Sequence, residues 1–231
     1  RPGLAGPVAD VADGLAHSTL LSGPFSGDTD AVEATLADRD LDAEPTPDDH
    51  RRVASLVALA VTEDAPARAT EAVARGLHPY AGGPFETVGG YADVLDAVAR
   101  DAPGTGIALA LDHPVHDRAL SAWRTHAQRA HRAVADATTG RYDGLFVARG
   151  DAMPVDTVAR LLADFHAPEP VTLVVTDGEA AARATDGRDV AATMRAATDA
   201  VGGTAAGQGD SARARFDAST ADLIEAFRGA T

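Results

Sequence analysis

The chain has 231 residues, 20 of them basic and 35 acidic, and it contains no cysteine. Disulfide scaffolds and cysteine-bound metals are therefore excluded, and no apolar run is long enough to span a membrane. A formal net charge of −15 also argues against long-range attraction of nucleic acids.

Helices are predicted along the first 140 residues, which we expect to form a helical connector region. Apolar residues recur at three- and four-residue spacing in five segments, namely residues 8–16, 28–37, 48–62, 67–76 and 91–100. The apolar run at residues 106–111 fits a buried strand as well as a buried helix. Asp48-Asp49-His50 opens the third segment. We interpret it as a helix start rather than a metal site, because acidic side chains stabilise helix N-termini.

One histidine pair raises the question of a metal site. His113 and His116 have a spacing that places both rings on one side of a helical turn. Pro114 lies between them and favours the beginning of a helix, and Asp112 is suited to cap that helix. We therefore expect a capped, solvent-facing turn here, and no metal site is predicted in this chain.

The charge is uneven along the chain, and residues 118–149 form a net positive stretch with six arginines and two acids. Trp123, Ala127, Ala130 and Val134 recur there at helical spacing. The arginines lie at several angles around this helix, which leaves two interpretations open. They face nucleic acid, or they form salt bridges with acidic neighbours.

A helix is predicted over residues 189–200. A glycine-rich corner follows, and the alternation of residues 212–217 then sends Arg213 and Arg215 to one face of a strand. Ser219 is suited to cap a final helix.

Gly202 and Gly203 at the corner allow two interpretations. Glycine lacks a Cβ atom, so backbone N–H groups here can turn toward an anion, with the two arginines behind them contacting a phosphate. Alternatively, the glycines only end the preceding helix in a left-handed cap, and the arginines form a solvated strand face.

The chain from residue 141 onward, with Gly202-Gly203-Thr204-Ala205-Ala206-Gly207 at the corner, resembles the DHH-associated domain at the C-terminus of RecJ-like exonucleases of the DHH phosphoesterase superfamily, particularly the archaeal ones. In this resemblance, residues 142–149 look like the first strand of that domain, residues 155–165 like its first helix and residues 171–177 like its second strand. In that family the corner reads Gly-Gly-His followed by Ala-Ala-Gly, and a Ser-x-Arg strand supplies an arginine to the nucleic-acid backbone. Here Arg183 takes the place of that arginine, Thr204 replaces the histidine, and Ala181 replaces the serine.

The resemblance implies an α/β fold with two parts, a helical region over residues 1–140 and a small mixed-sheet domain of the DHH-associated type over residues 141–231. It also implies that the second part binds the phosphate backbone of single-stranded DNA or RNA. The implied contacts are Gly202, Gly203, Thr204, Arg183, Arg213 and Arg215.

Catalysis in RecJ-like proteins is carried by an N-terminal domain in which aspartates and an Asp-His-His motif hold two divalent metals. No Asp-His-His occurs in this sequence, and the chain begins with Arg1 rather than methionine. We therefore expect a fragment that is not a nuclease by itself and holds no cofactor, with Mn or Mg bound in a catalytic domain elsewhere. The alternative is a non-catalytic RecJ-like replisome scaffold that binds a GINS-type partner, a role that would suit the replaced histidine and serine.

The composition of the charged residues suggests a reason for the acidic charge. Every basic residue is an arginine, and 27 aspartates accompany 8 glutamates, a composition that resembles that of haloarchaeal proteins. In molar salt the Debye length falls to about 3 Å, so only charges near a bound strand are felt. We expect a cytoplasmic protein of a salty cell, with no membrane contact.

Overall fold

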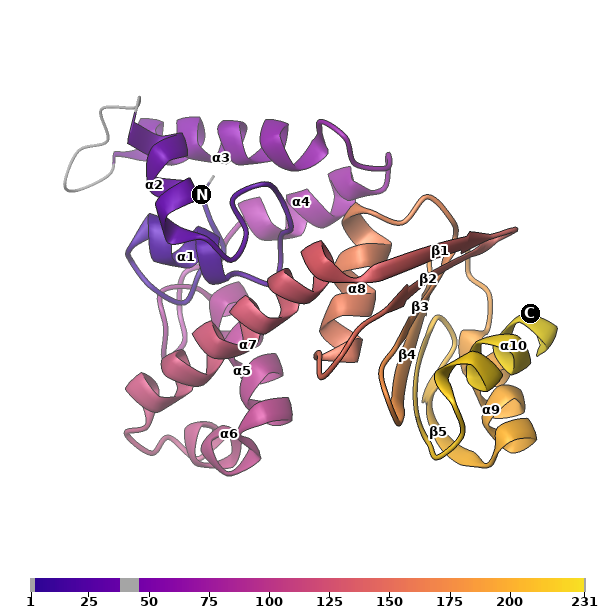
Figure 1. Ribbon diagram of the computed structural model, residues 1–231. Coiled ribbons are helices and arrows are strands. Elements are labelled where there is room, and N and C mark those ends of the chain that lie inside the picture. The colour runs from indigo at the N-terminus through magenta and orange to yellow at the C-terminus, as the bar shows by residue number, and fades with distance from the viewer. Residues whose placement is uncertain (1–2, 38–45, 231) are drawn as a thin grey trace. The chain divides into compact units, whose positions relative to one another are not determined.

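A computed structural model describes residues 3–37 and 46–230, and the chain divides into two compact units, Arg1–His131 and Arg132–Thr231 (Figure 1). The first unit is helical, and the second contains a mixed sheet with helices, so the predicted α/β class is confirmed. The boundary expected after residue 140 falls inside the first strand of the sheet, β1 (Thr138–Tyr142).

Seven helices are described in the N-terminal part of the chain. They are α1 (Val11–His17), α2 (Thr29–Ala37), α3 (Pro47–Thr62), α4 (Ala69–Leu77), α5 (Val88–Asp101), α6 (Pro103–Ala110) and α7 (His116–Asp136). All five segments predicted from periodicity contain a helix. The ambiguous run at residues 106–111 belongs mostly to α6, so it is helical.

The first turn of α3 has the capping arrangement expected for Asp48-Asp49-His50. The Thr46 hydroxyl accepts from the backbone N–H of Asp49, and the Asp49 carboxylate accepts from the backbone N–H of Thr46. Both groups satisfy amides that have no partner within the helix. The interpretation of this motif as a helix start is confirmed.

The core of the first unit surrounds a buried tryptophan on α7. Trp123 packs with a cluster of apolar residues from α5, α6 and α7, namely Val94, Ala97, Val98, Leu109 and Ala119. Its indole Nε1 donates to the buried carboxylate of Asp93 at 2.9 Å, and this carboxylate also accepts from the backbone N–H of Thr19 at 3.0 Å. A polar network is thereby fixed inside the apolar core.

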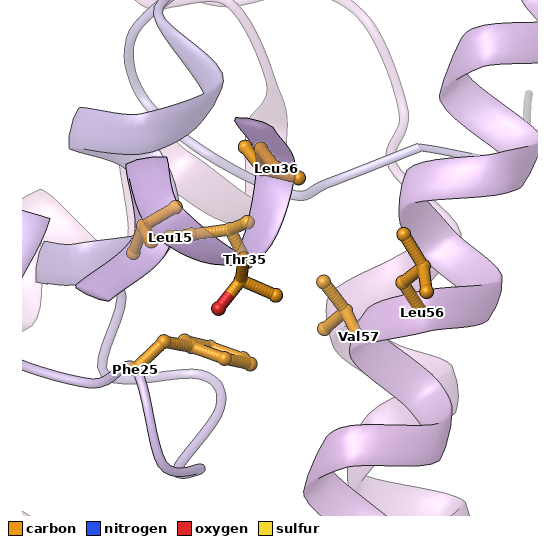
Figure 2. Close-up of a pocket in the computed structure, with 7 residues that line it drawn as sticks. Leu15, Phe25, Thr35, Leu36, Leu56 and Val57 are labelled. Carbon is orange, nitrogen blue, oxygen red and sulfur yellow. The ribbon is translucent and has the colours of Figure 1, made fainter. Parts of the chain in front are cut away.

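A small apolar cavity lies in the same unit (Figure 2). Its lining consists of Leu15, Phe25, Val32, Thr35, Leu36, Leu56 and Val57. Its volume of about 10 Å³ accommodates at most a single water molecule. We therefore regard it as a packing gap and not as a ligand site.

The second unit contains a six-stranded sheet in the order β1-β2-β3-β4-β6-β5. Its strands are β1 (Thr138–Tyr142), β2 (Leu145–Arg149), β3 (Val171–Val175), β4 (Glu179–Ala184), β5 (Gly203–Gln208) and β6 (Ser211–Phe216). Only the β2–β3 pair is parallel, and helix α8 (Val155–Phe165) makes the crossover between them. Helices α9 (Val190–Val201) and α10 (Thr220–Ala230) complete the unit.

The helices divide between the two faces of this sheet (Figure 1). On one face, Val147, Leu173, Ala214 and Phe216 form a core with residues of α9 and α10 such as Met194 and Phe227. On the other face, α8 contacts β3 and β4. Helix α8 therefore covers the middle strands on that face. The residues of β5 and β6 that point to the same side are exposed, apart from the half-buried Ser211.

Two sequence expectations need correction. The strand predicted over residues 142–149 is a hairpin, because Gly144 takes a φ of 73° and reverses the chain between β1 and β2. Asp112 does not cap α7, which begins at His116, and instead takes a left-handed φ of 59° after α6. The cap expected at Ser219 is confirmed, since its hydroxyl accepts from the Asp222 N–H at 3.1 Å.

Among the described residues, no helix combines the length and the apolar character that crossing a bilayer requires.

Candidate phosphate-binding face

Strand β6 has a strict alternation of small and charged side chains. Ala212, Ala214 and Phe216 are buried in the core, whereas Arg213 and Arg215 are exposed on the opposite face. The cause is the two-residue period of a β-strand, which separates alternate side chains by face. The sequence expectation that both arginines share one strand face is confirmed.

Strand β4 adds a third arginine to that face. In the antiparallel β4–β6 ladder, Ala181 lies opposite Arg213 and Arg183 lies opposite Ser211. Directly opposed residues share a face, so Arg183 and Arg213 are diagonal neighbours across the two strands. Arg183 is half-buried, while Arg213 and Arg215 are exposed.

Strand β5 completes the face from the sheet edge. Thr204 lies opposite Arg215, and Ala206 lies opposite Arg213. All three β5 residues on this side, Thr204, Ala206 and Gln208, are exposed. We call the group of Arg183, Arg213, Arg215 and Thr204 the arginine face.

Ion pairing distinguishes the three arginines. Arg215 donates through Nε to Oε1 of Glu179 at 3.2 Å, across the β4–β6 ladder. Within the residues that the structure describes, neither Arg183 nor Arg213 has a carboxylate partner. Two guanidinium groups on this face are therefore free to bind an external anion. Guanidinium presents several N–H donors in a plane, a geometry that suits a phosphate.

The two glycines of the corner have different structural roles. Gly202 ends α9 with a φ of 79°, which an L side chain rarely adopts. Gly203 is the first residue of β5 and pairs with Phe216, where an added Cβ would lie 2.5 Å from the carbonyl oxygen of Arg215. Helix α9 thus passes directly into a paired strand, without an open loop. The cap interpretation accounts for Gly202, and close strand packing accounts for Gly203.

The structure therefore brings together only part of the implied contact set. The side chains of Arg183, Arg213, Arg215 and Thr204 share one face of the sheet. Gly202 and Gly203 lie at the α9–β5 junction, and Gly203 belongs to the row of residues that faces the core. An anion on this face would be held by arginine side chains, with the Thr204 hydroxyl as an additional donor.

Glu179 is a functional candidate that sequence reasoning missed. It lies on β4 in the same alternation as Ala181 and Arg183, which places it on the arginine face. That periodicity was available from the sequence. Its position opposite Arg215 depends on the register of β4 against β6, which the sequence does not display.

The net positive stretch of residues 118–149 shows salt bridging at several positions. Arg124 binds both carboxylate oxygens of Asp13, with its closest contact at 2.7 Å. Arg129 pairs with Asp101 at 3.1 Å, and Arg141 pairs with Glu169. For these three arginines, the interpretation as salt-bridge partners of acidic neighbours is confirmed.

No group of three or more histidine, aspartate or glutamate side chains in the described residues is arranged to hold a metal ion. The His116 ring instead packs edge-on against Phe85, with 5.4 Å between ring centroids. His126 bonds to the Asp101 carboxylate through Nδ1 at 2.9 Å. Both side chains thus contribute to packing and hydrogen bonding within the first unit.

Comparison with known proteins gives a match to the second unit. Residues 137–229 match a family model described as the C-terminal domain of the uncharacterized protein rrnAC1427. A relative, the uncharacterized protein rrnAC1427 of Haloarcula marismortui, is 72% identical over 233 residues, and the alignment covers 100% of this chain and 63% of the relative. The chain thus spans less than two thirds of the length of that relative.

Two solved structures have weak similarity. One, described as "Member of s1p family of ribosomal proteins PF0399 DHH domain", has a TM-score of 0.37 and 14% identity, covering 50% of this chain and 32% of that one. An uncharacterized protein from Helicobacter pylori G27 has a TM-score of 0.24 and 16% identity, covering 58% of this chain and 42% of that one. The family model, in contrast, covers all six strands of the sheet that holds the arginine face.

Proposed function

We propose that the second unit binds the phosphate backbone of single-stranded DNA or RNA through the arginine face. In this proposal the unit is the nucleic-acid-binding part of a RecJ-like exonuclease of the DHH superfamily. The observation that carries the proposal is a pair of diagonal neighbours on one sheet face, Arg183 and Arg213, neither of which has a carboxylate partner among the described residues, in a chain with a net charge of −15.

The acidic charge of the chain is compatible with this role in a salty cytoplasm, which we propose as the location. Long-range repulsion of the strand is screened in molar salt, whereas direct guanidinium–phosphate hydrogen bonds act at contact distance. This side of β4, β5 and β6 carries arginine, glutamate, threonine, glutamine and serine side chains but no exposed aromatic ring. Backbone contacts therefore account for the expected affinity, and we expect little preference among bases.

Cleavage would require groups outside the arginine face. We propose that Mn or Mg is bound in a separate DHH-type domain, where it would supply the Lewis acidity that phosphodiester hydrolysis requires. In this proposal the arginine face holds the nucleic-acid strand against that domain.

The test is a fluorescence-anisotropy titration of labelled single-stranded DNA, and of RNA of the same sequence, in molar potassium chloride. We expect Arg213→Gln and Arg183→Gln each to weaken binding about ten-fold, because each removes a charged hydrogen-bond donor. Arg188→Gln is the matched control. It removes the same charge from the same unit, at a residue that pairs with Asp186 outside the strands.

A substitution at the glycine corner would not report on phosphate binding alone. The side chain of Gly203→Val, for example, would collide with the carbonyl oxygen of Arg215 and distort β5. A wild-type chain that binds neither DNA nor RNA would contradict the proposal. Retention of a GINS-type partner by Arg183→Gln, together with absence of strand binding, would favour the replisome scaffold instead.

A further inference from the structure

Glu179 brings a negative charge to the arginine face. Its carboxylate lies opposite Arg215 and accepts from the guanidinium Nε at 3.2 Å. The Glu179 side chain is 49% exposed and that of Arg215 is 81% exposed, so the pair lies at the surface where an anion would approach. Of the three arginines on this face, Arg215 alone has such a partner among the described residues.

We propose that Glu179 restrains Arg215 and thereby limits the affinity of the arginine face for phosphate groups. The identity of the ligand rests on the function proposed above, whereas the restraint rests on the ion pair. The Glu179 carboxylate and a bound phosphate compete for the same guanidinium donors, and the two anions repel each other.

The magnitude of the effect is limited by the exposure of the pair. An ion pair between solvent-exposed side chains is weak and is further screened by salt. Its removal should therefore tighten anion binding about two- to five-fold. A third arginine then contributes to binding, which steepens the salt dependence of the affinity by up to about 0.7 logarithmic units per added phosphate contact.

The experiment uses the full chain and Glu179→Gln, which removes the charge and keeps the shape of the side chain. Labelled oligothymidylate is titrated by anisotropy in molar potassium chloride, in the wild-type background and in an Arg215→Gln background. We expect Glu179→Gln to tighten binding two- to five-fold in the first background and to have no effect in the second. Asp186→Asn, the matched control, removes one charge from the Arg188 pair and should leave the affinity unchanged.

Inorganic pyrophosphate is the second probe, followed through the arginine Nε–H resonances of the same variants. Equal affinity of wild type and Glu179→Gln for both probes would overturn the inference. Equal tightening in the Arg215→Gln background would also overturn it, because the effect would then be general repulsion. Tighter pyrophosphate binding by Glu179→Gln without strand binding by any variant would support the restraint and reject the proposed function. Binding of neither probe by any variant would reject both.

Discussion

Trp123 and Asp93 are joined by a hydrogen bond of 2.9 Å between the indole Nε1 and the carboxylate, with both side chains almost fully buried. A buried carboxylate is tolerated only where donors surround it, and the Thr19 backbone N–H supplies another donor to the same oxygen. The link fixes α5 against α7 and the segment after α1.

Asp93→Asn should therefore destabilise the chain by about 2 to 4 kcal/mol. An amide nitrogen in place of a carboxylate oxygen cannot accept a hydrogen bond, so it would leave buried donors without an acceptor. The measurement is urea unfolding followed by circular dichroism. Asp96→Asn on the same helix is the control. Among the described residues Asp96 pairs with Arg100 alone, at the surface, so loss of this pair should cost less than about 0.5 kcal/mol. Equal midpoints for the two variants would contradict the anchoring role of Asp93.

The Arg124–Asp13 pair predicts a defined pH dependence. Hydrogen bonds from Arg124, with a smaller contribution from His17, hold the pKa of Asp13 below its ordinary value of 3.8, despite partial burial that raises it. Stability from this pair is thus complete above pH 3.8 and is lost as the pH falls through the lowered pKa of the folded state. Arg124→Gln should cost about 1 kcal/mol near neutral pH, and less below pH 3.8.

This pH dependence is checked by urea unfolding of wild type and Arg124→Gln across the acid range. Arg51→Gln serves as the control, because its pair with Asp48 is exposed on both sides and should have little effect at any pH. A penalty for Arg124→Gln that stays constant down to the lowest pH would show that Asp13 is not the titrating partner.

Gly203→Ala should destabilise the second unit by about 1 to 3 kcal/mol, because the new Cβ would lie 2.5 Å from the Arg215 carbonyl oxygen and force β5 from β6. Gly229→Ala in α10 has open space around the new methyl group, and alanine favours helix, so it should be neutral or slightly stabilising. Thermal unfolding followed by circular dichroism compares them. A neutral Gly203→Ala would mean that the strand pair opens easily.

Thr172→Val should be neutral or stabilising by up to about 1 kcal/mol. The Thr172 hydroxyl is fully buried and has no hydrogen-bond partner among the described residues, and valine has nearly the same shape. The matched control is Thr198→Val, which removes a buried hydroxyl that donates to Met194 and should destabilise by about 1 kcal/mol. Destabilisation by Thr172→Val in the same unfolding assay would indicate an ordered water on that hydroxyl.

The five helical segments between residues 8 and 100 were predictable from apolar spacing alone. The helix over residues 155–165, which the resemblance implies, is α8 with the same bounds. The residues at 142–149 were predicted as one strand, although Asp143-Gly144 is a favourable hairpin turn. A run rich in strand-forming residues obscured that signal. The helix over residues 103–110 could not be distinguished from a strand by periodicity, since its apolar residues are nearly continuous.

The candidate site was predictable only in part. Alternation alone places Arg213 and Arg215 on one face of β6. The register of β4 against β6 brings Arg183 close to Arg213 and Glu179 close to Arg215. This register joins segments far apart in the chain, so no local sequence pattern predicts it. The direct passage of α9 into β5 was also hidden, because a glycine pair is equally suited to a loop and to a cap.

The position of Trp123 gives the protein a built-in optical reporter. It is the single tryptophan of the chain and lies in the core of the first unit, so its emission follows the unfolding of that unit. The sheet unit contributes to circular dichroism but not to tryptophan emission. Coincident transitions by the two signals would show that both units unfold as one cooperative system, and separate transitions would show that each is a folding unit of its own.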